Sequence, residues 1–178
     1  MEIRAFEASD AAAIETLFVA VFSEAGGEAE GTMVGKLAHE MLATTNRRDL
    51  YGFVARDAAR VLGAILFTRL TFTVDIEAFI LSPVAVATTC QGQGVGSNLI
   101  NYGIRKLAKD GVTLVTTYGD PAYYSRLGFQ PLSTTVIQPP FELSQPVGWL
   151  GQSLDGATIE RISGQCTCVE ALNHPEYW

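Results

Sequence analysis

The 178-residue chain is predicted to fold as a mixed α/β or α+β protein, with a mostly antiparallel central sheet flanked by helices. Two β-rich runs follow each other with a short connection, and apolar residues recur at helical spacing in three other segments. A glycine-rich turn joins a strand to the third helical segment. Because the sequence has no evident linker, repeat or low-complexity tract, we expect one domain over residues 1–178.

Composition and charge narrow the class of protein. Hydrophobic residues make up 48% of the chain and charged residues 17%, as in globular proteins. The formal net charge of -7 argues against a nucleic-acid partner, because such binding needs a basic face. The first four residues lack the basic-then-apolar order of a signal peptide, and no apolar run approaches the roughly 20 residues of a membrane span. We therefore expect a cytoplasmic protein with no membrane partner.

The first elements are a strand and two helices. An apolar segment at residues 3–6 predicts the strand, and Ser9 and Asp10 are candidate caps of a helix with apolar residues at 14, 17, 18, 21 and 22. The Gly26-Gly27 pair separates it from a second helix, for which Thr32 is a candidate cap. The apolar stripe of that helix contains residues 34, 37, 41 and 42.

Three β-rich runs follow, at residues 50–55, 61–70 and 76–86. Residues 56–60 connect the first two runs and are few enough for an antiparallel hairpin. The third run contains Pro83, which cannot donate a ladder hydrogen bond and is expected at an edge or bulge.

The second half of the chain begins with a helix whose apolar stripe, residues 99–108, ends at a glycine cap at Gly111. Residues 112–118 are the next predicted strand. Asp120 and Pro121 then have the pattern that starts a short helix, which Gly128 closes. The remainder is interrupted by prolines, and residues 157–162 are its clearest strand candidate.

The three cysteines, Cys90, Cys166 and Cys168, are odd in number and have no second cluster with zinc-ligand spacing. We expect reduced thiols and no metal.

The turn Gln91-Gly92-Gln93-Gly94-Val95-Gly96 suits an anion, because glycines let the backbone approach it and a helix start directs amide groups at it. A nucleoside triphosphate loop needs Lys and then Ser or Thr after its last glycine, but Ser97 and Asn98 follow here. A dinucleotide fingerprint needs its third glycine where Ser97 stands.

A different pattern is met, namely [Gln/Arg]-x-x-Gly-x-[Gly/Ala], at Gln91, Gly94 and Gly96. Downstream, the run Gly-Asp-Pro-Ala-Tyr-Tyr-Ser-Arg-Leu-Gly-Phe at residues 119–129 contains a Tyr-x-x-x-Gly-Phe segment. With both motifs in this order, the sequence resembles the GNAT N-acetyltransferase superfamily, and within it a bacterial subgroup with a Gly-Asp-Pro-x-Tyr-Tyr-x-Arg-x-Gly-Phe run. The resemblance covers residues 76–131. It departs at Thr88-Thr89, where many members have Pro-Glu.

The resemblance implies a single GNAT-like domain that uses acetyl-CoA as co-substrate. It implies that the pantetheine arm pairs with the backbone of Val84, Ala85 and Val86, and that the Val84 N–H faces the thioester oxygen. The remaining implied cofactor-binding residues form the turn and the helix start: Gln91, Gly92, Gln93, Gly94, Val95, Gly96 and Ser97.

The reaction implied is direct attack of a primary amine on the thioester in a ternary complex. Tyr124, four residues before Gly128, corresponds to the tyrosine that protonates the departing thiolate. Glu77 is the first choice for the general base and Asp75 the second, while Glu24 or Glu28 could reach over the acceptor. The alternative function is a non-catalytic acyl-CoA-binding regulatory domain. The motifs name no amine acceptor, and a homodimer is one option for the assembly.

Overall fold

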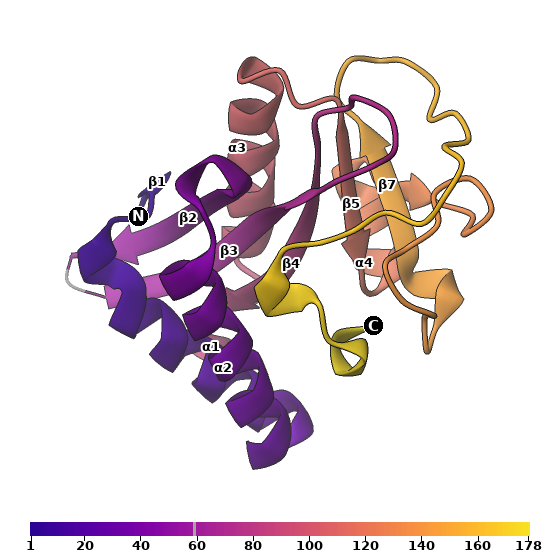
Figure 1. Cartoon of the computed structure of the whole chain (residues 1–178). Helices are drawn as coiled ribbons and strands as arrows, with labels where there is room; N and C mark the ends of the chain where they lie inside the picture. The colour runs from indigo at the N-terminus through magenta and orange to yellow at the C-terminus, as the bar shows by residue number, and fades with distance from the viewer. Residues whose placement is uncertain (59) are drawn as a thin grey trace. The chain divides into compact units, whose positions relative to one another are not determined.

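The computed structural model describes residues 1–58 and 60–178 (Figure 1). Two compact units are formed, the first by residues 1–67 and 83–103, the second by residues 68–82 and 104–178. Strands β3 (Arg60–Leu70) and β4 (Ala78–Val86) and helix α3 (Val95–Lys109) contribute residues to both units. The single domain over residues 1–178 stays a prediction. The predicted 56–60 hairpin connection contains residue 59, which lies outside the described residues.

The first unit begins with strand β1 (Glu2–Ala5), which pairs antiparallel with β2 (Leu50–Asp57). Helices α1 (Ala11–Gly26) and α2 (Glu28–Thr44) lie side by side (Figure 1). Their approach is close because α2 contains Gly35, where an added Cβ would lie 2.2 Å from a methyl carbon of Val19. The predicted apolar stripes are confirmed in their central residues, since Ile14, Leu17 and Phe18 of α1 and Val34, Leu37 and Met41 of α2 are buried, while Val21, Phe22 and Leu42 are half-buried.

The caps predicted for the first two helices need correction. Helix α2 starts at Glu28, four residues before Thr32, because Gly27 has a φ of 95° and accepts the first helical bond, from the Gly31 amide, at 3.1 Å. Asp10 precedes α1 but its side chain does not cap it.

Asp10 is instead the centre of a buried ion-pair network in the first unit. Its carboxylate accepts hydrogen bonds from Arg4 at 2.7 and 3.1 Å, from Arg56 at 3.1 Å and from the Glu7 amide at 2.8 Å. The hydrogen bonds from Arg4 hold the pKa of Asp10 below its usual range, although its burial opposes this shift. The network joins the chain before α1 to strands β1 and β2.

The sheet has seven strands. Their order is β1-β2-β3-β4 in the first unit and β4-β5-β7-β6 in the second, with β4 shared by both. In the second unit, β5 (Leu114–Tyr118) runs parallel to β4, with Ala78 opposite Leu114 and Leu81 opposite Thr117. Strand β7 (Trp149–Ser153) is antiparallel to both β5 and β6 (Gln130–Pro131). The predicted mixed, mostly antiparallel sheet with flanking helices is confirmed.

The strand predicted at residues 157–162 is wrong, because this segment is irregular and the C-terminal strand is β7. Backbone bonds of the irregular segment go to a loop, as from the Ile162 amide to the Val136 carbonyl at 3.0 Å. In β7, Trp149 and Leu150 are buried, and the Trp149 indole donates to the Ile137 carbonyl at 3.0 Å.

Predicted helix ends in the second half are confirmed. Gly111, with a φ of 89°, follows α3, and Gly128, with a φ of 90°, follows the segment begun by α4 (Pro121–Tyr124). Asp120 caps α4 by accepting a hydrogen bond from the Ala122 amide at 2.8 Å. Among the described helices, none is long and apolar enough to cross a membrane.

Candidate functional site

The glycine-rich turn lies in the first unit, between a short 3₁₀ helix (Thr88–Cys90) and α3. Gly92 and Gly94 have φ angles of 71° and 80°, which L side chains rarely adopt. Residues 91–94 are exposed, and an added Cβ at Gly92 would meet no atom within 4 Å. The backbone of residues 91–94 is therefore accessible to a ligand from solvent.

The side chains of this turn are folded back onto its own backbone. Gln91 donates its amide hydrogen to the Val86 carbonyl at 3.1 Å, and Gln93 donates to the Thr89 carbonyl at 3.0 Å. These two bonds stabilise the loop in the conformation that exposes the glycines. They also explain the use of glutamine here, because a neutral side chain can donate to a carbonyl without adding charge.

Helix α3 supplies the main electrostatic feature of the turn. Its first backbone bond runs from the Asn98 amide to the Gly94 carbonyl at 2.9 Å. The amides of Gly94, Val95, Gly96 and Ser97 therefore have no partner within the helix. Together they carry the positive end of the helix dipole, which suits a phosphate.

The last residues of β4 precede this turn within the first unit. Ala85 is buried, whereas Val84 and Val86 are partly exposed. An added Cβ at Gly63 would lie 2.8 Å from a methyl carbon of Leu99 and 3.2 Å from the Ala85 carbonyl oxygen, so the chain approaches this strand closely at Gly63. Pro83 provides no amide hydrogen to its neighbours.

Thr88 connects the start of the turn to helix α1. Its hydroxyl donates a hydrogen bond to the carboxylate of Glu24. Thr88, where many family members have proline, therefore has a structural role in this chain. The contact also occupies one carboxylate oxygen of Glu24, which is one of the alternative candidates for the general base. Glu28, the other alternative, is exposed in the first turn of α2.

The second unit holds Tyr124, at the end of α4. Its position depends on Gly119, where an added Cβ would lie 2.7 Å from Cε2 of the tyrosine ring. On its other side the ring packs edge-on against Phe129, with centroids 5.6 Å apart. The ring is therefore held between a glycine and a buried aromatic residue.

The Tyr124 hydroxyl is hydrogen-bonded to the side chain of Thr117. The Thr117 hydroxyl in turn donates to the Leu81 carbonyl at 2.9 Å. The interaction with Thr117 lowers the pKa of Tyr124, but the effect of burial is larger. Burial raises the pKa of Tyr124 to about 12, so this phenol is protonated at neutral pH.

Glu77 lies in the second unit, directly before β4. Its carboxylate accepts a hydrogen bond from Arg69 at 2.7 Å, and the Arg69 guanidinium also lies over the Phe79 ring, 4.8 Å from its centroid. Four residues along an extended strand, or roughly 13 Å, separate Glu77 from Leu81. The role of Glu77 as general base stays a prediction, and so does that of Asp75.

Asp75 lines a cavity of about 700 Å³ within the second unit, together with residues of the irregular segment 157–163. This places the second-choice base on the loop between β3 and β4. Among the residues described, no group of three or more His, Cys, Asp or Glu could hold a metal ion. The cysteines described are free thiols.

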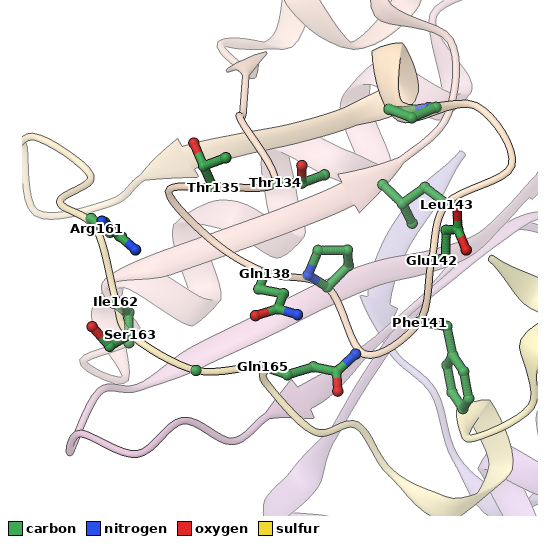
Figure 2. A pocket seen from close by; sticks show the side chains of 13 residues that line it. Thr134, Thr135, Gln138, Phe141, Glu142, Leu143, Arg161, Ile162, Ser163 and Gln165 are labelled. Atoms are coloured by element: carbon green, nitrogen blue, oxygen red, sulfur yellow. The ribbon is translucent and has the colours of Figure 1, made fainter.

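A second cavity of about 690 Å³ lies in the same unit, between residues 134–146 and 161–165 (Figure 2). Phe141, Leu143 and Ile162 supply apolar walls, and Glu142 and Arg161 supply opposite charges. Sequence reasoning missed all five, because they belong to no motif and come from two segments without regular secondary structure. No signal in the sequence links these segments.

Comparison with known proteins assigns this fold to the acetyltransferases. A family model described as an acetyltransferase (GNAT) domain matches residues 48–131. The Escherichia coli K12 protein named uncharacterized N-acetyltransferase YjhQ is 32% identical over 140 residues, which cover 75% of this chain and 77% of that protein. The chain therefore belongs to the GNAT family of N-acetyltransferases.

Solved structures agree with this membership. The GNAT N-acetyltransferase YhbS of Escherichia coli, solved in complex with CoA, is 25% identical, with a TM-score of 0.83 over 97% of this chain and 92% of that chain. A GNAT acetyltransferase of Brucella melitensis, solved with acetyl-CoA, has the same fold, with a TM-score of 0.75, 23% identity and coverage of 96% and 97% of the two chains. The alternative of a non-catalytic domain finds no support among these relatives.

Proposed function

We propose that this protein transfers an acetyl group from acetyl-CoA to a primary amine by direct attack in a ternary complex. The observation that carries the proposal is the exposed glycine turn followed by the amides at the start of α3 that have no partner within the helix. Similar structures have been solved with CoA and with acetyl-CoA, which supports the same ligand for this turn.

In the proposed complex, the amides of residues 93–96 and the Ser97 hydroxyl receive the pyrophosphate, while Gln91 and Gly92 shape the turn around it. The pantetheine arm pairs with the backbone of Val84, Ala85 and Val86, and the Val84 amide stabilises the oxyanion that develops on the thioester. The partial exposure of Val84 and Val86 supports this path for the arm.

The amine nitrogen attacks the thioester carbon, an N–C bond forms, and the C–S bond breaks. An alkyl amine is mostly protonated at pH 7, and its deprotonation costs about 4.6 kcal/mol for a pKa near 10.4. A base is therefore needed, and Glu77 remains the proposed one, acting through water on the oxygen that Arg69 does not hold.

Tyr124 is the proposed acid, which gives its phenolic proton to the departing thiolate. Its pKa of about 12 keeps it protonated before the reaction, and its hydrogen bond with Thr117 helps to hold the phenol in place. The phenolate that forms is then reprotonated by solvent, which also takes up the proton lost by the amine.

A thiol-release assay with acetyl-CoA and a panel of primary amines tests the proposal. We expect Tyr124→Phe to lower kcat by about 10²-fold or more, because general acids contribute about that much, while the affinity for CoA is retained. Tyr123→Phe is the matched control, since it removes a hydroxyl from the adjacent ring. CoA binding without turnover on any amine would refute the proposed reaction.

A further inference from the structure

We propose that the cavity between residues 134–146 and 161–165 binds a small zwitterion. Its ammonium group would face Glu142 and its anionic group Arg161. The inference concerns binding at this cavity and stands apart from the proposed acetyl transfer.

The size and walls of the cavity suit a small molecule. Its volume of about 690 Å³ lies in the range of ligand pockets, about 300–1,000 Å³. Phe141, Leu143 and Ile162 offer apolar surface for a carbon chain. A folded protein would not enter a space of this volume.

The opposite charges of Arg161 and Glu142 indicate which class of ligand the cavity binds. Figure 2 shows Arg161 and Glu142 on opposite sides of the cavity, with Gln138 and Gln165 between them. Within residues 1–58 and 60–178, neither charged side chain forms a hydrogen bond or ion pair. Arg161 would repel a polyamine and Glu142 a dicarboxylate, whereas a zwitterion satisfies both.

The walls that carry these charges are held by backbone contacts. Gln165 donates to the Pro140 carbonyl at 2.7 Å, and the Cys166 amide donates to the Gln138 carbonyl at 3.1 Å. These bonds connect the two segments that form the cavity, so Arg161 and Glu142 are carried by walls fixed to each other. A fixed separation between the charges predicts a preference for one ligand length.

Tyr118 contacts the loop that carries Glu142, and in β5 it directly follows Thr117, the residue bonded to the proposed acid. Its hydroxyl accepts a hydrogen bond from the Gln145 amide at 2.7 Å and shares a hydrogen bond with the Ser144 hydroxyl at 2.9 Å. Thr117, the preceding residue of β5, points to the other face of the sheet, where it bonds to Tyr124. The loop that carries Glu142 and the acid are therefore attached to the same end of β5 from opposite faces.

The test measures binding of ω-amino acids of increasing chain length to the full chain with CoA present, by titration calorimetry. Each is compared with the alkylamine and the carboxylate of the same length. We expect one length of ω-amino acid to bind about tenfold more tightly than its alkylamine, because an Arg–carboxylate contact is added. Arg161→Gln should remove this preference, and Glu142→Gln should weaken both the ω-amino acid and the alkylamine.

Arg47→Gln is the matched control, because it removes an exposed arginine that does not line the cavity. The inference is wrong if no ω-amino acid binds better than its alkylamine, or if Arg161→Gln leaves the preference unchanged. Acetyl transfer is measured separately with the amine panel. Transfer to other amines without a zwitterion preference would refute only the inference, whereas zwitterion binding without any transfer would refute only the reaction.

Discussion

Replacing Thr117 with valine tests whether this hydroxyl positions the proposed acid. The substitution keeps the shape of the side chain but removes the hydroxyl that is hydrogen-bonded with Tyr124 and donates to the Leu81 carbonyl. Each neutral hydrogen bond contributes about 1 kcal/mol, so the free energy of unfolding should fall by no more than about 2 kcal/mol. The protein should remain folded.

The effect on catalysis should be larger than the effect on CoA binding. We expect Thr117→Val to lower kcat about tenfold, because a freely rotating phenol retains only part of the roughly 10²–10⁴-fold contribution of a general acid. The KM for acetyl-CoA should be unchanged. Since the pKa of Tyr124 is about 12, the acid stays protonated and the loss should be the same from pH 6 to pH 9.

Thr116→Val is the matched control for this prediction. Thr116 is the neighbouring buried threonine, and its hydroxyl has no hydrogen-bond partner among the residues described. Its replacement by a methyl group should leave kcat unchanged and keep or raise stability. If Thr117→Val keeps kcat within twofold, or if both variants lose the same activity, the positioning role is wrong.

Three further predictions concern other parts of the fold. Asp10→Asn should cost about 1–3 kcal/mol in urea unfolding, because it removes the charge that accepts hydrogen bonds from Arg4 and Arg56, and an unchanged stability would contradict this. Gly119→Ala should lower kcat at least about tenfold with CoA affinity retained, since the new Cβ would lie 2.7 Å from Tyr124, whereas equal losses in both would argue against a local effect. Burial raises the pKa of Cys166 from 9.0 to about 12, so the folded thiol resists ionisation and stability should fall as pH rises from 9 to 12. That fall should be less steep in Cys166→Ala.

The sequence allowed prediction of the glycine turn because its determinants are local. Gly92 and Gly94 stand where the backbone takes positive φ angles, and Asp120 caps the helix that it immediately precedes. Helical stripes and glycine caps depend on neighbours within a few residues, so spacing alone reveals them. The strand before the turn and the helix after it follow from the same short-range rules.

Other features depend on residues that are distant in the sequence. Asp10 was predicted to cap a helix, but its carboxylate instead pairs with Arg56, which is distant in the sequence. The partner of Tyr124 is Thr117, whose own bond to Leu81 follows from the parallel pairing of β4 and β5. The cavity between residues 134–146 and 161–165 likewise forms from two irregular segments. No periodicity or motif predicts such contacts.

Calorimetric titration of acetyl-CoA into Gly94→Ala and Gly111→Ala tests the central claim most directly. Both glycines have positive φ angles, 80° and 89°, so both substitutions strain the backbone by about 1–2 kcal/mol. Gly94 precedes α3 and Gly111 follows it. If the turn holds the pyrophosphate, Gly94→Ala should weaken acetyl-CoA binding about tenfold and Gly111→Ala should leave it unchanged. Equal affinity in both variants and the parent chain would contradict the assignment of acetyl-CoA to this turn.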